Sequence, residues 1–135
     1  MHPNEELARR EAEAWAIRTA SEEALGMYTD DAVIHYPGRN PLAGAYVGHD
    51  GLREFASRIG ELVGDGTIRR ELHDALGTDE HAVQLLTVEA EVGARRHAWR
   101  AAIVMHVRDG KISEAWVTVE DQYALDEFLN TIARG

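Results

Sequence analysis

The sequence predicts an α+β fold in which helices cover one face of a curved, mainly antiparallel sheet. Four segments in the C-terminal half are rich in β-branched and aromatic residues, and we expect long strands over Thr67–Gly77, His81–Val92, Arg96–Arg108 and Lys111–Val119. Short turn-forming breaks separate them, and Asp109-Gly110 is a strong hairpin signal. The upstream half is mostly helical in pattern, so its helices must cover the sheet. We expect a pocket between the two layers.

The composition fits a single domain, which we expect to span residues 1–135. Hydrophobic residues make up 44% of the chain and charged residues 28%, which are ordinary values for a globular protein. The net charge of -10 disfavours nucleic acids and membrane surfaces as partners, because both are bound by basic patches. The absence of cysteine excludes disulfides, thiolate zinc sites and cysteine nucleophiles. No signal peptide or membrane-spanning apolar run is visible, so we expect a cytoplasmic protein.

Two helices are predicted at the start of the chain. The first runs from Asn4, its expected N-cap, to about Ala20. One of its faces carries Ala8, Ala12, Trp15, Ala16 and Thr19. Trp15 is the one large residue on that face, and it is either a packing aromatic or a wall of the pocket. Ser21 is expected to cap a second, short helix that ends at Met27 or Tyr28.

The middle of the chain is predicted to contain a short strand, a long loop and a helix. Ala32–Tyr36 is β-prone and is stopped by Pro37. Residues 37–48 contain two prolines and three glycines, which favours a loop at the rim of the pocket. Asp50 is the expected N-cap of the next helix, whose apolar stripe comprises Leu52, Phe55, Ala56, Ile59, Leu62 and Val63. A last helix or docking segment contains Leu125, Phe128, Leu129 and Ile132.

The run from Tyr28 to Gly38, YTDDAVIHYPG, resembles the signature of the SnoaL-like branch of the NTF2-like superfamily. Residues 37–48, the strand-turn-strand unit Val107–Trp116 and the segment Asp121–Asp126 fit the same branch, so the resemblance covers nearly the whole chain. It implies an NTF2-like cone, in which N-terminal helices pack on a strongly curved sheet. Such domains often dimerise through the outer face of the sheet. Members include polyketide cyclases, ketosteroid isomerases, limonene-type epoxide hydrolases, dehydratases and noncatalytic binders.

Departures from the family's catalytic patterns argue against two of these activities by their usual mechanisms. In the ketosteroid isomerases, an Asp base works against an oxyanion hole made of a Tyr and a neutral Asp. The matching positions here are Tyr36, Trp15 and Ile103, so all three parts are absent. The limonene-type epoxide hydrolases are similar to one another in using an Asp-Arg-Asp relay around one water. This sequence has no matching triad either.

The cyclase-like members imply a general acid/base Asp near the end of the last strand. The matching position is Asp121, with Glu120 as its competitor if the register differs by one residue. Alternation through Ala115, Val117 and Val119 carries Asp121 to their face of the strand and Glu120 to the opposite face. An apolar cone would raise the pKa of such an acid toward the working pH. Asp121 is also a candidate cap for the last helix, and the two roles do not exclude each other.

His35 and Tyr36 end the first strand, and their side chains point to opposite faces. The resemblance favours Tyr36 as the residue that lines the pocket and donates a hydrogen bond to a ligand carbonyl. The alternative for Tyr36 is a buried tyrosine whose hydroxyl is satisfied within the protein. His35 is then a rim or outer-face residue, although a one-residue bulge would exchange the two.

The remaining binding residues that we expect around the pocket are Trp15, Phe55, His97, Trp99 and Val119. His97 and Trp99 share one strand face, so both are expected to look inward, whereas His73 and His106 join the outer surface. No His-x-Glu or His-x-x-x-His spacing is present, so we expect no metal site. No glycine-rich phosphate loop or nucleophile elbow is visible, and we expect no cofactor.

Two functions follow from these expectations. The first is a cofactor-independent acid/base enzyme, of the cyclase, isomerase or lyase (dehydratase) class, acting on a small hydrophobic molecule with a carbonyl group. The second is a noncatalytic small-molecule-binding or dimerisation domain of the same fold. Trp116 is expected on the face that points away from the cone, which indicates a homodimer through the outer sheet.

Overall fold

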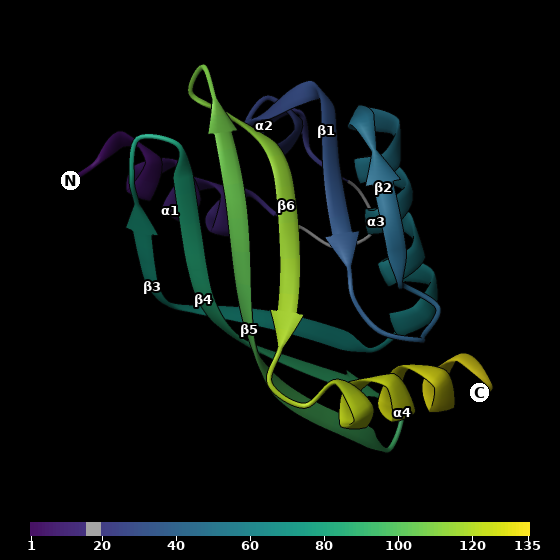
Figure 1. The fold of residues 1–135 in the computed structure, drawn as a ribbon. Coiled ribbons are helices and arrows are strands. Elements are labelled where there is room, and N and C mark those ends of the chain that lie inside the picture. The colour runs from purple at the N-terminus through teal and green to yellow at the C-terminus, as the bar shows by residue number, and fades with distance from the viewer. Residues whose placement is uncertain (16–19) are drawn as a thin grey trace.

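The computed structural model describes residues 1–15 and 20–135, which form the predicted α+β fold (Figure 1). The described helices are α1 (Pro3–Ala14), α2 (Glu22–Leu25), α3 (Gly48–Val63) and α4 (Gln122–Ala133). The described strands are β1 (Tyr28–Tyr36), β2 (Gly44–Val47), β3 (Thr67–Gly77), β4 (His81–Val92), β5 (Arg95–Arg108) and β6 (Lys111–Val119). The four predicted long strands are confirmed, with β5 beginning one residue earlier than expected.

The strands form one sheet in the order β2-β1-β6-β5-β4-β3. Neighbouring strands are antiparallel, except that β1 and β6 are parallel. In Figure 1 the long strands β3, β4 and β5 bend along their length, with α1 beside one end and α4 across the other. α3 packs against β1 and β2. The bend therefore lets three separate helices cover different parts of one continuous sheet.

The first helix is shorter than predicted. It ends at Ala14, and Trp15 already has an extended backbone. The predicted continuation toward Ala20, which includes Ala16 and Thr19, lies outside the described residues. The buried residues of α1 are Asn4, Leu7, Ala8 and Glu11. The covered face of this helix therefore includes a carboxylate that the predicted alanine-rich face did not contain.

The N-cap of α1 differs from the prediction, whereas the N-cap of α2 agrees with it. The N-cap of α1 is His2, whose Nδ1 accepts a hydrogen bond from the backbone N of Asn4 at 3.0 Å. Asn4, the predicted cap, is buried and donates to the Thr78 carbonyl at 2.6 Å. The helix begins earlier because Pro3 is well suited to its first position, where the missing N–H is not needed. Ser21 is confirmed as the cap of α2.

The predicted loop over 37–48 contains a strand. Gly44–Val47 forms β2, which pairs with β1. The segment is only four residues long, so the open edge of β1 decides its conformation more than its own pattern does. α3 begins directly after it, at Gly48. Asp50 is therefore not the N-cap of α3; that position belongs to Val47, which makes no side-chain hydrogen bond there.

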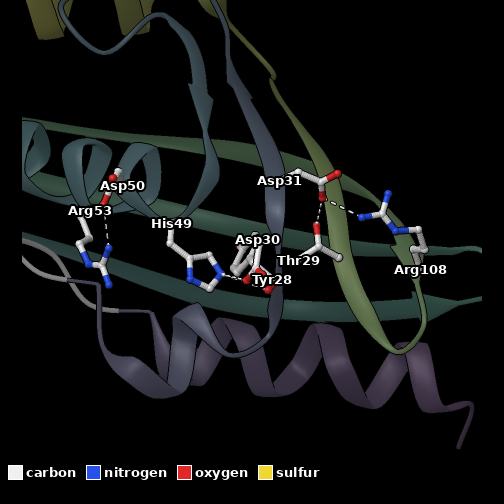
Figure 2. A network of polar contacts seen from close by, with 8 residues as sticks. All are labelled: Tyr28, Thr29, Asp30, Asp31, His49, Asp50, Arg53 and Arg108. Carbon is white, nitrogen blue, oxygen red and sulfur yellow. Dashed lines mark hydrogen bonds and ion pairs between the residues drawn. The ribbon is translucent and has the colours of Figure 1, made fainter.

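Figure 2 shows the polar contacts that fix the N-terminal end of β1. Asp31 accepts hydrogen bonds from Thr29 Oγ1 at 2.8 Å and from the Arg108 guanidinium at 2.7 Å. These two donors lower the pKa of the Asp31 carboxyl. His49, in the first turn of α3, has its Nε2 3.2 Å from the carbonyl oxygen of Tyr28. The contacts tie β1 to β5 and to α3.

Two hydrophobic clusters form the core. One lies under α3 and α4 and includes Phe55, Ile59, Trp99, Leu125 and Leu129. The other lies under α1 and α2 and includes Leu7, Leu25, Ile34, Met105 and Ile112. Leu72 and Ile103 pack against both clusters. The predicted stripe of α3 is confirmed, since all its members are buried or half-buried. None of the described helices is long and apolar enough to cross a lipid bilayer.

Candidate functional site

An apolar cavity of about 90 Å³ lies between the sheet and the helices α3 and α4. α3 contributes Phe55 and Ile59 to its wall, and α4 contributes Leu129. Trp99 from β5 and Tyr36 from the end of β1 close other sides. Successive side chains of a strand point to opposite faces of the sheet. Trp99 and Tyr36 point inward, and the residues next to them in the chain point to the outer face. The cavity is thus a space inside the hydrophobic core, with walls from both layers.

The Tyr36 hydroxyl is one of the few polar groups in this lining. Its ring lies 5.3 Å from the Phe55 ring, measured between centroids. Burial raises the pKa of Tyr36, and this outweighs the opposing effect of the nearby Arg70 charge. The phenol is therefore protonated at any physiological pH. No hydrogen bond joins its hydroxyl to another described residue, so it is available as a donor to a bound molecule.

Arg70, on β3, is the second strongly polar group in the lining. Its Nη2 donates to Gln84 Oε1 over a long distance of 3.4 Å. The residue also lines a smaller cavity of about 40 Å³ on the side of α1, together with Glu11, Trp15 and Tyr28. Arg70 therefore stands at the boundary between the two spaces.

Glu11 of α1 is a carboxylate inside the core, with only 3% of its surface exposed. Its Oε2 accepts a hydrogen bond from the Tyr28 hydroxyl at 2.5 Å, and its Oε1 accepts one from Gln84 Nε2 at 2.8 Å. Gln84 also donates to the Ala8 carbonyl at 2.8 Å. Burial, and then the Glu11 charge, raise the pKa of Tyr28 well above its ordinary value, so Tyr28 remains a donor. The chain Arg70–Gln84–Glu11–Tyr28 thus crosses the core as one connected polar network.

Four of the residues predicted for the pocket gather in this region. Tyr36, Phe55 and Trp99 line the larger cavity. Trp15 lines the smaller one, with its ring 6.0 Å from that of Phe55. The structure thus places one predicted hydrogen-bond donor and three predicted aromatic walls around two adjacent spaces.

Asp121, the predicted general acid/base, lies outside both cavities. The residue is exposed, and its Oδ1 accepts a hydrogen bond from the backbone N of Ala124 at 3.1 Å, as the N-cap of α4. Its competitor Glu120 is also exposed and lies 3.8 Å from Arg100. The alternation used to place Asp121 fails because β6 already ends at Val119 and the chain turns into the helix. Of its two expected roles, the structure displays the cap.

His35 and Val119 also lie away from the cavity. His35 is on the outer sheet face, where its Nε2 is 2.6 Å from Glu114 Oε2 and its ring stacks on Trp116 with centroids 5.4 Å apart. No bulge exchanges it with Tyr36. Val119 packs against the core but borders a groove on the outer face instead of the cavity. Neither residue is among those that line the cavity beside Tyr36.

His97 lies on the inward strand face, as predicted, but beneath α4 and not in the cavity wall. Its ring is 5.5 Å from that of Trp99 and 5.3 Å from that of Phe128. It borders a surface groove beside α4. Its Nε2 is buried without a hydrogen-bond partner among the described residues. The ring therefore acts as part of an aromatic stack.

The polar network is the part of the site that the sequence reasoning missed. A signal for Arg70 was present, because it has the same strand parity as Ile68 and Leu72, which pack against the core. Glu11 follows Leu7 by four positions and so shares its buried helix face. Within the described residues, no three His, Asp or Glu side chains converge as metal ligands.

Comparisons with known proteins agree with this architecture. The sequence model of the SnoaL-like domain matches residues 8–115. The solved structure of Bal32a, from a soil-derived mobile gene cassette, is 25% identical, with 94% of this chain and 96% of that chain covered and a TM-score of 0.83. No curated protein sequence matches this chain.

Two further solved structures share the fold. TerC, co-crystallised with polyporic acid, is 20% identical, with 95% of this chain and 98% of that chain covered and a TM-score of 0.80. An NTF2-like protein of unknown function from Burkholderia pseudomallei is 18% identical, with 96% and 98% covered and a TM-score of 0.81. Because the domain match spans most of the sequence, this chain belongs to the SnoaL-like domain family, and it shares its fold with the NTF2-like protein.

Proposed function

We propose that this protein binds a small, mostly apolar molecule with one acceptor oxygen, such as a carbonyl, in the cavity under α3 and α4. The observation that carries the proposal is Tyr36, whose side chain lines an apolar space and whose protonated hydroxyl has no hydrogen-bond partner among the described residues. The hydroxyl is thus a free donor, and a ligand oxygen would accept a hydrogen bond from it. Family membership supports a small organic ligand, and so does the co-crystallisation of TerC with polyporic acid.

A binding test follows directly from this geometry. Aromatic ketones and the matching hydrocarbons would be titrated into the protein, with tryptophan fluorescence, to which Trp99 in the cavity wall contributes, as the readout. Tyr36→Phe is expected to weaken ketone binding by roughly 2- to 10-fold, because one neutral hydrogen bond is lost, and to leave hydrocarbon binding unchanged. Ala90→Leu should fill the cavity and abolish both, since Ala90 is buried in its wall.

The matched control for the cavity-filling variant is Ala98→Leu, which adds the same side chain to an exposed position of β5. It should bind as the wild type does. If Ala90→Leu and Ala98→Leu bind the ketones equally well, the cavity is not the site and the proposal fails.

A second candidate function is proton-transfer catalysis of the cyclase, isomerase or dehydratase class. The pairing of Tyr36 and Arg70 in one lining favours it, because a phenol donor and a cation would together stabilise an enolate oxygen. Water would accept the proton, since no free carboxylate of a described residue lines this cavity. The protein would then accelerate exchange of the hydrogen next to a bound ketone in heavy water.

Proton NMR measures that exchange without knowledge of the natural substrate. Catalysis predicts faster exchange with the wild type, a loss of the effect in Tyr36→Phe, and no change in Asp121→Asn. Exchange at the uncatalysed rate, with ketone still bound, would leave the noncatalytic binding function.

A further inference from the structure

We propose that Arg70 makes the cavity selective for an organic anion, that is, a small apolar body that ends in one carboxylate or enolate oxygen. The inference rests on the proposed function, because it specifies what the same cavity binds. Tyr36 supplies a second donor to the same oxygen group.

The state of Arg70 differs from that of the other described arginines. Seven of them form ion pairs with Asp or Glu, namely Arg9, Arg53, Arg58, Arg69, Arg96, Arg100 and Arg108. Four others are exposed to water, namely Arg10, Arg39, Arg95 and Arg134. Among the described arginines, only Arg70 is both half-buried and without an ion pair. Charged groups withdrawn from water are normally paired with an opposite charge. Arg70 lacks such a partner, and an anionic ligand would supply one.

The donors of Arg70 are largely unused. A guanidinium carries five N–H donors, and the described contacts of Arg70 use one, in the 3.4 Å hydrogen bond to Gln84 Oε1. A carboxylate or enolate in the cavity would receive charge-assisted hydrogen bonds, which are about twice as strong as neutral ones. The arginine is therefore equipped to bind an anion more tightly than a neutral molecule of the same shape.

Glu11 does not neutralise Arg70, although both line the smaller cavity. The two carboxylate oxygens of Glu11 already accept from Tyr28 and Gln84, and no ion pair joins Glu11 to Arg70. Gln84 stands between them, donating to the carboxylate and accepting from the guanidinium. The amide therefore holds the two charges apart, and Arg70 remains at the wall of the larger cavity.

The rest of the lining limits the kind of anion. Apart from Tyr36, Arg70 and the indole of Trp99, the lining residues are aliphatic or Phe. A polyanion such as a nucleotide would leave most of its charge without a partner. The cavity of about 90 Å³ is also smaller than the roughly 300–1,000 Å³ of common ligand pockets. Both facts favour a compact monoanion.

Isothermal titration calorimetry with two probes tests the inference. Benzoate is the anionic probe, and benzyl alcohol is the neutral probe of similar size, both at neutral pH. We expect the wild type to bind benzoate roughly 10- to 100-fold more tightly than the alcohol. Arg70→Met should bind the two about equally, and Arg70→Lys should retain part of the preference, since lysine keeps the charge but not the fork of donors.

Arg69→Met is the matched control, because Arg69 lies on the same strand but is exposed and pairs with Glu89. It should keep the wild-type preference. If Arg70→Met does not fold, Arg70→Gln takes its place, since it removes the charge and keeps a polar group beside Gln84.

The outcomes separate the inference from the proposed function. If neither probe binds the wild type and a set of ketones also fails, the cavity is not a binding site. If the alcohol binds as tightly as benzoate, the proposed function stands and anion selectivity is wrong. A preference for benzoate that survives in the neutral Arg70 variants would also overturn the inference.

Discussion

At the scale of single residues, neighbouring positions in this chain have very different surroundings. Tyr36 faces an apolar cavity, while His35, one position earlier, pairs with Glu114 on the outer face. Asp121 differs again, because it stands where a strand becomes a helix and its carboxylate serves the helix backbone. A shift of one position along the chain is thus enough to move a side chain from the cavity to the outer surface and to change the chemistry open to it.

The cap assigned to Asp121 gives a stability prediction. Asp121→Ala is expected to lower the free energy of unfolding by about 1 kcal/mol, because the backbone N of Ala124 loses its acceptor. Asp121→Asn should cost much less, since asparagine is an equally good N-cap. Urea denaturation of the three proteins measures the difference. Equal losses in both variants would show that the charge matters and the cap does not.

At the scale of the elements, Asp126 joins α4 to the segment that follows β1. Its carboxylate accepts hydrogen bonds from Asn40 Nδ2 at 2.7 Å and from Gln122 Nε2 at 2.9 Å. Gly38 makes room for this junction, because it has a φ of 95° and a Cβ there would lie 2.2 Å from the Gln122 amide. The C-terminal helix is therefore held by polar contacts at its first turns and by apolar ones along its length.

The junction predicts a dependence of stability on pH. Partial burial raises the pKa of Asp126, but the hydrogen bonds from Asn40 and Gln122 outweigh this and lower it overall. A lowered folded-state pKa stabilises the protein above the unfolded value of about 4, and this contribution is lost as the pH falls further. Asp126→Asn should therefore reduce the urea midpoint at pH 7 more than at pH 3.

The measurement is a pair of urea titrations at each pH, with Glu127→Gln, an exposed neighbour on α4, as the control. Glu127→Gln should lower the urea midpoint by the same small amount at both pH values. An Asp126→Asn effect that is independent of pH would contradict the role given to this carboxylate.

The elements also show which parts of the structure could be read from the sequence. The long strands were predictable because turn-forming residues, such as Asp109 and Gly110 between β5 and β6, mark where they end. β2 was not, because it exists only through its pairing with β1. Arg70 and Glu11 carry local signals of burial, but their connection through Gln84 spans three elements and no local pattern contains it.

At the scale of the whole molecule, the outer sheet face is a second surface with its own character. Trp116 lies there between His35, whose ring is stacked on it, and His106, whose ring centroid is 4.8 Å away edge-on. Leu85 is exposed on the same side of the sheet. We propose that a second copy of the chain covers this face, as the sequence predicts.

Trp116→Lys tests this assembly. Light scattering after size exclusion should report a dimer for the wild type at micromolar concentration and a monomer for the variant, because a buried lysine would disrupt an apolar contact. Tyr123→Lys is the control, since Tyr123 is 89% exposed on α4, and it should remain dimeric. A wild type with monomeric mass would refute the proposal.

The bend in the long strands links regions that would otherwise be independent. β3, β4 and β5 carry residues of both hydrophobic clusters, and Leu72 and Ile103 touch both. Neither cluster can come apart without breaking strands that the other needs, so the chain should melt in a single cooperative transition. Anything that occupies the cavity at one end then raises the melting temperature of the entire molecule. A library of small acids and ketones can be screened by that shift alone.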